Sequence, residues 1–314
     1  MNFYARDLVF FTCSDPKRRV HPVSMKTQRN LTQPLIIRTL RELRSQMWAW
    51  RGAGETIGYV PTMGALHNGH LSLIRLSKQK TSKTIVSIYV NPTQFAPDED
   101  FGSYPRPTDR DIEKLADMGC DAVYIPEGTI YADDHSTYLK VNGVGDGLET
   151  DHRPSFFEGV VLVVMKLLNR VQPDMAVFGE KDYQQLTIIR RMVRDMDIPV
   201  KIIGGPIIRD DHGLALSSRN AYFDTDGLEI ARQLNKLMYD CAENLKSGSD
   251  VKAALAKTKA AILKAGFDSI DYLELADAAS LKFITAQPFV TPARLLVVAR
   301  CKGIRLLDNC AVGE

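Results

Sequence analysis

Two histidines lie three residues apart in the segment PTMGALHNGH, residues 61–70, which directly follows an apolar run. Gly64 and Gly69 allow the backbone to approach a ligand closely, and a helix that begins at the end of this segment would expose unpaired N–H groups at its positive dipole end. A polyphosphate suits such a site. His67 and His70 would flank it, either as hydrogen-bond donors or, if protonated, as cations that neutralise charge between the α- and β-phosphates.

The residues alone leave two other interpretations of this segment open. An isolated H-x-x-H pair more often forms a surface turn with a helix-capping residue. Two histidines at this spacing can also share one helix face as metal ligands, but no carboxylate or cysteine lies nearby in the sequence to complete the usual ligand set of zinc. We therefore favour phosphate over metal here and assign no metal ligands.

Two further motifs supply partners for a nucleotide. In FGEKDYQQL, residues 178–186, Lys181 can reach a phosphate and Asp182 can accept hydrogen bonds from ribose hydroxyls. This motif lies between an expected strand end and a helix start, where ligands bind in open α/β sheets. In DDHGLALSSRN, residues 210–220, two serines and an arginine are good donors to phosphate oxygens. Each motif also fits an ordinary charged turn or a helix N-cap.

A fourth motif, YVNPTQFAPDED at 89–100, contains two neutral amides. Asn91 and Gln94 can hydrogen-bond a hydroxyl or a carboxylate of a small substrate. The alternative is a polar turn organised by Pro92 and Pro97. Alone, this motif does not distinguish the two.

These motifs need a scaffold to position them, and the sequence predicts one. From Leu35 onward, short β-branched runs alternate with helical patterns, which favours the α/β class with a doubly wound (Rossmann-like) parallel sheet. Strands are expected at 56–61, 84–90, 122–126, 175–179 and 200–208. Helices are expected at 70–80, 108–118, 157–170 and 183–196.

The pattern changes after about residue 205, where two helical patterns precede three strand patterns, an α+β order. The helices are expected at 226–246 and 250–265, and the strands at 270–277, 293–300 and 304–309. A stretch rich in Pro, Gly and Asp at 206–212 suggests the boundary. We therefore predict a Rossmann-like domain over 31–206 and a smaller α+β domain over 207–314.

Composition narrows the class of protein. The chain has 314 residues, of which 45% are hydrophobic, and it can therefore bury a sizeable core. Its net charge of +2 does not favour nucleic acid as a partner. Five scattered cysteines without C-x-x-C spacing predict neither a disulfide framework nor a zinc site and suit a reducing cytoplasm. No apolar run approaches the roughly 18 to 20 residues that span a bilayer, so we expect no membrane association.

The first 30 residues differ from this scaffold. They are basic and contain serine and threonine, but Asp7, Asp15 and the lack of an apolar region with a small-residue cleavage site argue against a signal peptide. A transit peptide and a mis-started extension both remain open, since Met25 lies just before the first periodic segment. We predict a disordered extension over 1–30.

Together and in this order, the motifs resemble those of the pantoate–β-alanine ligase family (the pantothenate synthetases), in the nucleotidyltransferase superfamily whose signature is H-x-G-H. The likeness extends from about Leu35 to Asn309. The matching motifs are PTMGALHNGH, NPTQF, YPR, FGEKDYQQL, GLALSSRN and RLLDN. One H-x-G-H is a weak signal, whereas the ordered set is specific.

The resemblance implies two half-reactions. ATP and pantoate first give pantoyl adenylate and pyrophosphate, and β-alanine then attacks this mixed anhydride to give pantothenate and AMP. It also implies Mg²⁺ held mainly by the ATP phosphates and water, a cytoplasmic homodimer formed through the nucleotide-binding domain, and a C-terminal domain that moves as a lid.

Site residues follow from the resemblance by position. His70 would be the catalytic histidine, with His67 as its partner and Lys181 at the phosphates. Residues expected at pantoate and β-alanine are Gln94, Gln185, Asn91 and Arg153. Residues expected at ATP are Met63, Gly64, Ala65, Leu66, His67, Asn68, Gly69, His70, Gly179, Glu180, Lys181, Asp182, Ile208, Leu216, Ser217, Ser218 and Arg219.

One position departs from the family pattern. Where the family commonly has R-P-G-H-F, this chain has RPSFF at 153–157, so that Phe156 replaces a histidine near the substrates. Arg153 and Gly159 still match. The loss of a polar donor would lower activity unless another group, such as His152, compensates for it.

Three rival functions remain. Another H-x-G-H nucleotidyltransferase would transfer a nucleotide to a phosphorylated acceptor, but Gln94 and Gln185 argue against it because such an acceptor calls for further arginines or lysines. An RNA-binding synthetase-like module conflicts with the near-neutral charge. A catalytically weakened ligand-binding homologue is motivated only by Phe156.

Overall fold

The computed structural model describes residues 33–95, 102, 106 and 108–313. The expected extension over 1–30 and the first two residues of the YPR motif lie outside the described residues. Residues 33–313 belong to one compact unit. The division of this unit near 206–212 remains a prediction.

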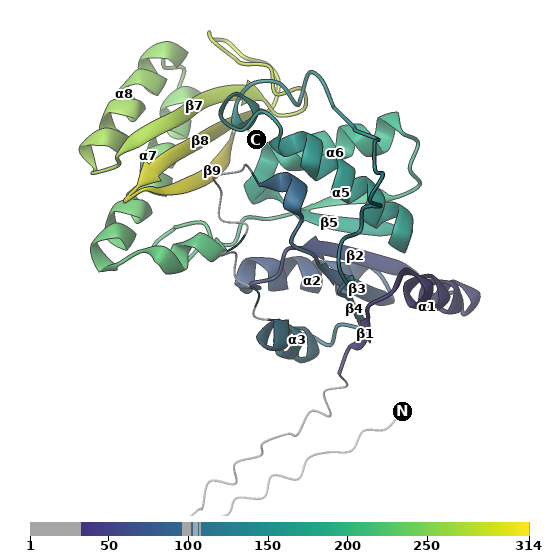
Figure 1. The fold of residues 1–314 in the computed structure, drawn as a ribbon. Helices are drawn as coiled ribbons and strands as arrows, with labels where there is room; N and C mark the ends of the chain where they lie inside the picture. Colours follow the sequence, from purple (N-terminus) through teal and green to yellow (C-terminus); the bar gives the residue numbers. More distant parts are fainter. Residues whose placement is uncertain (1–32, 96–101, 103–105, 107, 314) are drawn as a thin grey trace, which may run out of the picture. The chain divides into compact units, whose positions relative to one another are not determined.

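The larger sheet has six strands, all parallel, in the order β1-β4-β3-β2-β5-β6 (Figure 1). The strands are β1 (Leu35–Ile37), β2 (Ile57–Thr62), β3 (Lys83–Ile88), β4 (Ala122–Tyr124), β5 (Met175–Gly179) and β6 (Lys201–Gly205). After β2 the chain builds outward through β3 and β4, and it then returns to place β5 on the other side of β2. The switch point of the sheet therefore lies between β2 and β5, where ligands bind in open α/β sheets.

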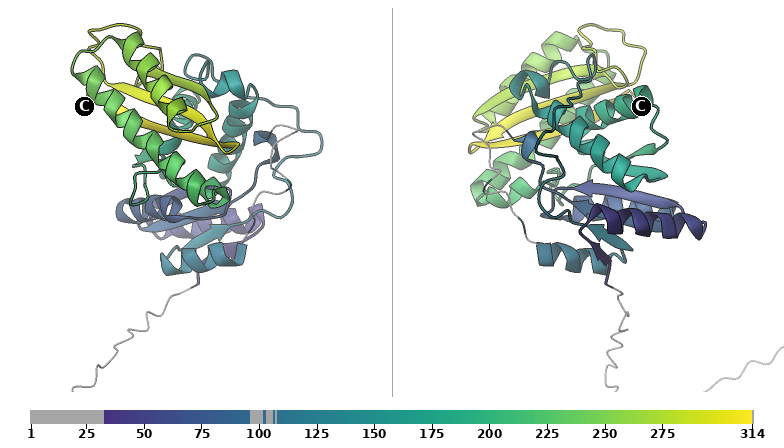
Figure 2. Two further views of the ribbon diagram at one scale, coloured as in Figure 1. Left: turned by 90° about the vertical axis from the view of Figure 1, so that its left-hand side faces the viewer. Right: turned by 45° about the vertical axis from the view of Figure 1, so that its right-hand side comes forward.

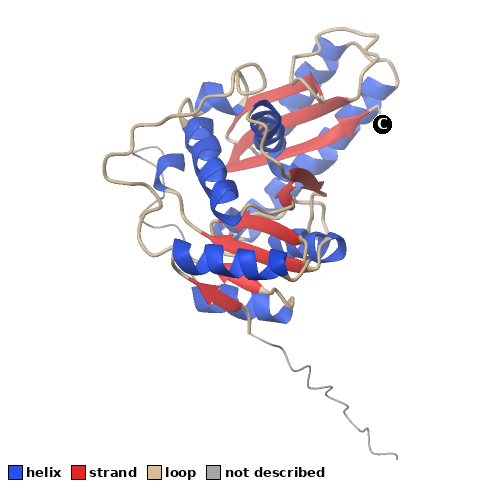
Figure 3. Ribbon diagram, turned by 90° about the vertical axis from the view of Figure 1, so that its right-hand side faces the viewer, coloured by secondary structure: helices blue, strands red, loops and turns tan. Residues whose placement is uncertain are grey.

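Helices cover both faces of this sheet (Figures 1 and 3). Neighbouring strand residues point to opposite faces, so Tyr59 belongs to one core cluster and Val60 to another. The first cluster includes residues of α1 (Leu40–Gly52), α5 (Phe156–Val171) and α6 (Tyr183–Asp195). The second includes residues of α2 (Asn68–Lys80) and α3 (Thr108–Asp117). The α/β class with a doubly wound parallel sheet is confirmed.

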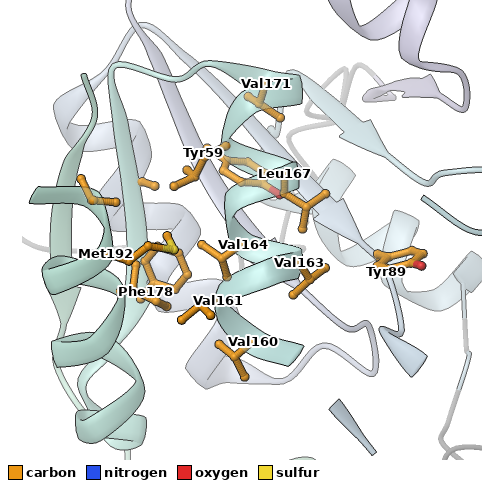
Figure 4. Packing of buried hydrophobic residues seen from close by; sticks show 14 of the residues in the cluster. Tyr59, Tyr89, Val160, Val161, Val163, Val164, Leu167, Val171, Phe178 and Met192 are labelled. Carbon is orange, nitrogen blue, oxygen red and sulfur yellow. The ribbon is translucent and has the colours of Figure 1, made fainter. Parts of the chain in front are cut away.

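Helix α5 is apolar on nearly every side, as expected for a helix buried in a core. Figure 4 shows its valines between Phe178 and Met192 on one side and Tyr89 on the other. Ten of its residues are buried, which makes α5 a rigid support for the loops at its N-terminal end.

The smaller sheet has three antiparallel strands, β7 (Ser269–Asp277), β8 (Ala293–Cys301) and β9 (Ile304–Val312), in that order. Helices α7 (Thr225–Lys246) and α8 (Val251–Lys264) pack on one face through residues such as Leu275 and Val297 (Figure 2). The other face, which includes Leu296, packs against Tyr183 at the start of α6. The expected α+β arrangement is confirmed.

Short elements complete the fold and explain where predicted boundaries shift. They are α4 (Glu149–His152), η1 (Pro92–Gln94), η2 (Glu180–Asp182) and η3 (Ser218–Tyr222). The strand expected over 200–208 ends at Gly205 because Pro206 has no N–H to continue the ladder. The strand expected over 304–309 continues to Val312 through pairing with β8.

Candidate active site

A cleft of about 1020 Å³ lies at the carboxyl ends of β2 and β5 and extends to β9. This volume suits a nucleotide together with a small acid. Fifteen of the residues expected at the site line the cleft: Met63, His67, Gly69, His70, Gln94, Arg153, Gly179, Lys181, Asp182, Gln185, Ile208, Leu216, Ser217, Ser218 and Arg219. Residues that lie far apart in the sequence are thus brought to one place.

Six expected residues do not line the cleft: Gly64, Ala65, Leu66, Asn68, Glu180 and Asn91. Most of them support residues that do. Ala65 and Leu66 bond Asp111, Asn91 bonds α5, and the carbonyl of Glu180 bonds β9.

His67 is the N-cap of α2, and its side chain replaces the usual serine or threonine. Its Nδ1 accepts the backbone N–H of Gly69 at 3.1 Å, and the Nδ1 of His70 accepts the N–H of His67 at 3.3 Å. Because both Nδ1 atoms act as acceptors, the proton of each neutral ring lies on Nε2. The capping interpretation and the phosphate-site interpretation are therefore compatible: the same bonds that cap the helix fix the tautomer.

Burial lowers the pKa of both histidines. Desolvation is the largest cause and brings the pKa of His67 to about 4 and that of His70 to about 3, with positive Lys181 and Lys114 acting in the same direction. Both rings are therefore neutral at pH 7. They act as hydrogen-bond donors through Nε2–H, and these pKa values do not favour the alternative in which the rings are cations.

Asp111 holds the loop that joins β2 to α2. This fully buried carboxylate on α3 accepts the backbone N–H groups of Ala65 at 2.8 Å and Leu66 at 2.9 Å. Gly64 and Ala65 both have positive φ, at 84° and 51°, and Ala65 has a Cβ that disfavours this conformation. Lys114 also donates to the carbonyl of Leu66. The carboxylate thus stabilises a loop shape that the local sequence alone would not keep.

Sequence reasoning missed Asp111, although a signal was present. In the amphipathic α3 it lies one turn before Leu115, on the side that packs against the sheet. A carboxylate on an apolar face needs partners, since burial of an unpaired charge is strongly unfavourable. Here burial raises the pKa of Asp111 and the two N–H groups oppose that rise.

The amide pair at η1 divides into a support and a lining residue. Asn91 is fully buried; its Nδ2 donates to the carbonyl of Gly159 at 3.1 Å and its Oδ1 accepts from the hydroxyl of Tyr131 at 2.8 Å. Gln94 lines the cleft, and its backbone carbonyl accepts Nη2 of Arg153 at 3.1 Å. Asn91 therefore holds η1 against α5 and presents Gln94.

Close packing at Gly159 brings η1 and α5 together. A Cβ at this position would lie 2.1 Å from the carbonyl oxygen of Thr93, a distance that no side chain tolerates. Gly159 was identified in the sequence only as a family match, and the structure supplies the steric reason for it.

Phe156 contacts the guanidinium of Arg153, which lies 3.7 Å from the ring centroid. Both side chains line the cleft, and Arg153 also bonds Glu149 at 3.3 Å. His152 lines the cleft as well, with its ring centroid 6.0 Å from that of Tyr272. The phenylalanine thus supports a cation at the cleft wall.

The segment 208–219 meets the H-x-G-H loop across the cleft. The N–H of Leu216 donates to the carbonyl of Ile208 at 2.9 Å, which closes the segment into a hairpin-like turn. The Cβ of Leu216 lies 3.8 Å from the position that a Cβ on Gly69 would take. The hydroxyl of Ser217 accepts the N–H of Arg219 and caps η3. The serines and the arginine are therefore placed opposite the histidines.

Within the part of the chain that the structure describes, no group of three or more His, Cys, Asp or Glu side chains could hold a metal ion. In the same residues, no helix combines the length and the apolar character needed to cross a membrane.

The sequence profile of the pantoate-beta-alanine ligase family matches residues 35–311. The chain is 47% identical to the pantothenate synthetase of Caulobacter vibrioides over 285 residues, which cover 90% of this chain and 100% of the relative. It is 49% identical to that of Hyphomonas neptunium over 284 residues, covering 88% and 96% of the two chains.

Solved structures agree with the sequences. The pantothenate synthetase of Thermus thermophilus is similar with a TM-score of 0.82 at 37% identity, covering 88% of this chain and 98% of that one. The pantoate-beta-alanine ligase of Francisella tularensis, complexed with beta-gamma ATP and beta-alanine, is similar with a TM-score of 0.74 at 33% identity, covering 88% and 97%. Given the matching motifs, the cleft that gathers them and these relatives, the chain belongs to the pantoate–β-alanine ligase family.

Proposed function

We propose that this cleft condenses pantoate with β-alanine, using ATP and a pantoyl adenylate intermediate. The observation that carries the proposal is the convergence of His67, His70 and Lys181 with Gln94 and Gln185 on one cleft in a chain of this family. The donors His67, His70 and Lys181 lie on the segments that follow β2 and β5. The neutral amides of Gln94 and Gln185 would bind a small acid.

In the first half-reaction, a carboxylate oxygen of pantoate attacks the α-phosphorus of ATP. The bond from that phosphorus to the bridging oxygen breaks, and pyrophosphate leaves. Negative charge grows on the phosphoryl oxygens, where the Nε2–H groups of His67 and His70 and the ammonium of Lys181 donate. Ser217, Ser218 and Arg219 would donate from the opposite side.

In the second half-reaction, the amine of β-alanine attacks the carbonyl carbon of the adenylate. The carbon–oxygen bond to AMP breaks, the nitrogen loses a proton, and pantothenate and AMP result. Gln94, which lines the cleft, is proposed to orient both acids. A cleft that excludes water protects the anhydride until the amine arrives.

Asp182 is proposed to bind the ribose. Ile208 is proposed to bind the adenine through its backbone. Magnesium is proposed to enter with ATP, bound mainly by phosphate oxygens and water.

We also propose a cytoplasmic homodimer in which 31–206 provides the contact and 207–314 closes as a lid. The family resemblance motivates both. Edge strand β1, with Leu35 and Ile36 exposed, is a candidate contact, and 204–206 (GGP) is a candidate hinge. Light scattering after size exclusion tests the dimer, and small-angle scattering with and without ATP tests closure.

Pyrophosphate–ATP exchange with and without pantoate tests the function, followed by AMP release when β-alanine is added. Exchange that requires pantoate, and AMP release that requires β-alanine, are expected. Exchange that ignores pantoate contradicts the proposal. Adenylate formation without an amide product favours a weakened homologue.

A further inference from the structure

The motif RLLDN at 305–309 lies in β9 and has no role in the chemistry above. Its last two residues are polar yet almost completely enclosed: Asp308 is 4% exposed and Asn309 is 1% exposed. Successive strand residues point to opposite faces, so the two side chains reach different partners. Asp308 lies on the face that packs against α7, together with Leu306 and Cys310.

Asn309 reaches the loop that follows β5. Its Nδ2 donates to the backbone carbonyls of Glu180 at 3.0 Å and Lys181 at 2.8 Å. Its Oδ1 accepts Nε of Arg294 at 2.8 Å, and the guanidinium of Arg294 lies 4.2 Å from the ring centroid of Tyr183. Every polar group of the Asn309 side chain is thus engaged, and two of its bonds fix η2.

Asp308 reaches the other loop of the site. Its two oxygens accept Nη1 and Nη2 of Arg209 at 2.6 and 2.9 Å, a bidentate pair. Nη1 of Arg209 also donates to the carbonyl of Gly213 at 3.0 Å. Arg209 directly follows Ile208, so the carboxylate anchors the turn that leads to 216–219.

We propose that Asp308 and Asn309 are positioning residues that set the distance between two loops of the nucleotide site. Asn309 holds η2, which carries Lys181, and Asp308 holds 208–219. Because the two residues are adjacent on one strand, they fix the two loops relative to each other in this conformation. The lid movement proposed for 207–314 would therefore require the bonds from Asn309 to η2 to rearrange. This inference rests on the proposed function, in which Lys181 and 216–219 bind the phosphates.

The test is Asn309→Asp, a substitution of nearly equal shape. One oxygen of the new carboxylate would face the carbonyl oxygens of Glu180 and Lys181. The other oxygen would still accept Nε of Arg294. We expect kcat/KM for ATP in pantoate-dependent exchange to fall about tenfold or more, since two carbonyls lose their donor and repel the new oxygen. Asn244→Asp is the matched control: its Nδ2 also donates to a backbone carbonyl, that of Asp240 at 2.7 Å, on the exposed side of α7. It should leave exchange unchanged.

A double-mutant cycle separates positioning from general stabilisation. If Asn309 acts through Lys181, Asn309→Asp should change exchange less than about twofold in a Lys181→Ala background. Multiplicative losses would overturn the proposal. Asp308→Asn keeps the shape of the side chain but removes the negative charge that pairs with Arg209. It should raise KM for ATP, and an unchanged KM would overturn the role of Asp308.

Failure of the proposed function and failure of the positioning role give different results. Normal exchange in Lys181→Ala overturns the site and the inference together, whereas loss in Lys181→Ala with normal exchange in Asn309→Asp overturns the inference alone. If Asn309→Asp lacks a cooperative thermal transition, Asn309→Ala, which buries no charge, replaces it with the same thresholds.

Discussion

The Nδ1 atom of His70 accepts the backbone N–H of His67, the residue that caps the same helix. The two ring centroids lie 4.1 Å apart with their planes at 42°. This contact couples the cap of α2 to the catalytic group in the proposed mechanism. Any change at one ring therefore alters the orientation of the other.

Replacement of His70 by alanine should remove at least about 2.7 kcal/mol of transition-state stabilisation, or about a hundredfold in kcat, since one donor to the developing charge is lost. Single-turnover formation of pantoyl adenylate measures this. His212→Ala is the matched control, because His212 is exposed and does not line the cleft. Near-normal turnover in His70→Ala would refute the assigned role.

The pH dependence of stability should reflect both histidines. Their folded-state pKa values, about 4 for His67 and about 3 for His70, lie below the ordinary 6.5, so the unfolded chain binds more protons in the interval between. The contribution of the neutral rings to stability is complete above pH 6.5 and is lost as the pH falls towards 4. Urea unfolding of the wild type and of the double variant His67→Gln/His70→Gln at pH 7, 6 and 5 measures how the free energy of unfolding depends on pH. The wild type should lose stability more steeply; equal slopes would contradict the shifts.

Phe156→His should leave the fold intact and should not reduce turnover, because a histidine ring can also lie against Arg153. Phe156→Ala should be worse, since it removes a cation–π contact of about 0.5–1 kcal/mol. Thermal melts and steady-state kcat for both variants provide the comparison. A large loss in Phe156→His would show that the phenylalanine is an adapted part of this site.

Gly159→Ala should separate η1 from α5. The new Cβ would overlap the carbonyl of Thr93, so we expect about 1–3 kcal/mol of destabilisation and a raised KM for pantoate as Gln94 shifts. Gly52→Ala is the control, because nothing lies within 4 Å of a Cβ there. Equal melting temperatures and KM values in the two variants would count against the packing argument.

Much of the fold follows from local patterns. Short β-branched runs predicted β2 to β6, later strand patterns predicted the smaller sheet, and the apolar run over 157–170 predicted a buried helix, which is α5. The capping box of Thr39 and Glu42 at α1 was equally readable, although the helix was not predicted from it.

The supports of the site were not predictable in the same way. Asp111 lies 46 positions from Ala65, and Asn309 lies 128 positions from Lys181. No local period connects such pairs, since only the finished sheet brings them together. Asn91 illustrates the converse: its residue type suggested a substrate contact, whereas its side chain is used by α5 and Tyr131.

The carboxylate of Asp111 has a consequence for affinity. The loop 64–66 is already held in one conformation by contacts from another helix. Fixing one flexible backbone residue costs about 1–2 kcal/mol of conformational entropy, and here folding has met that cost before ATP arrives. Binding of the nucleotide to this loop should therefore proceed without local ordering, and most of the contact free energy should appear as affinity.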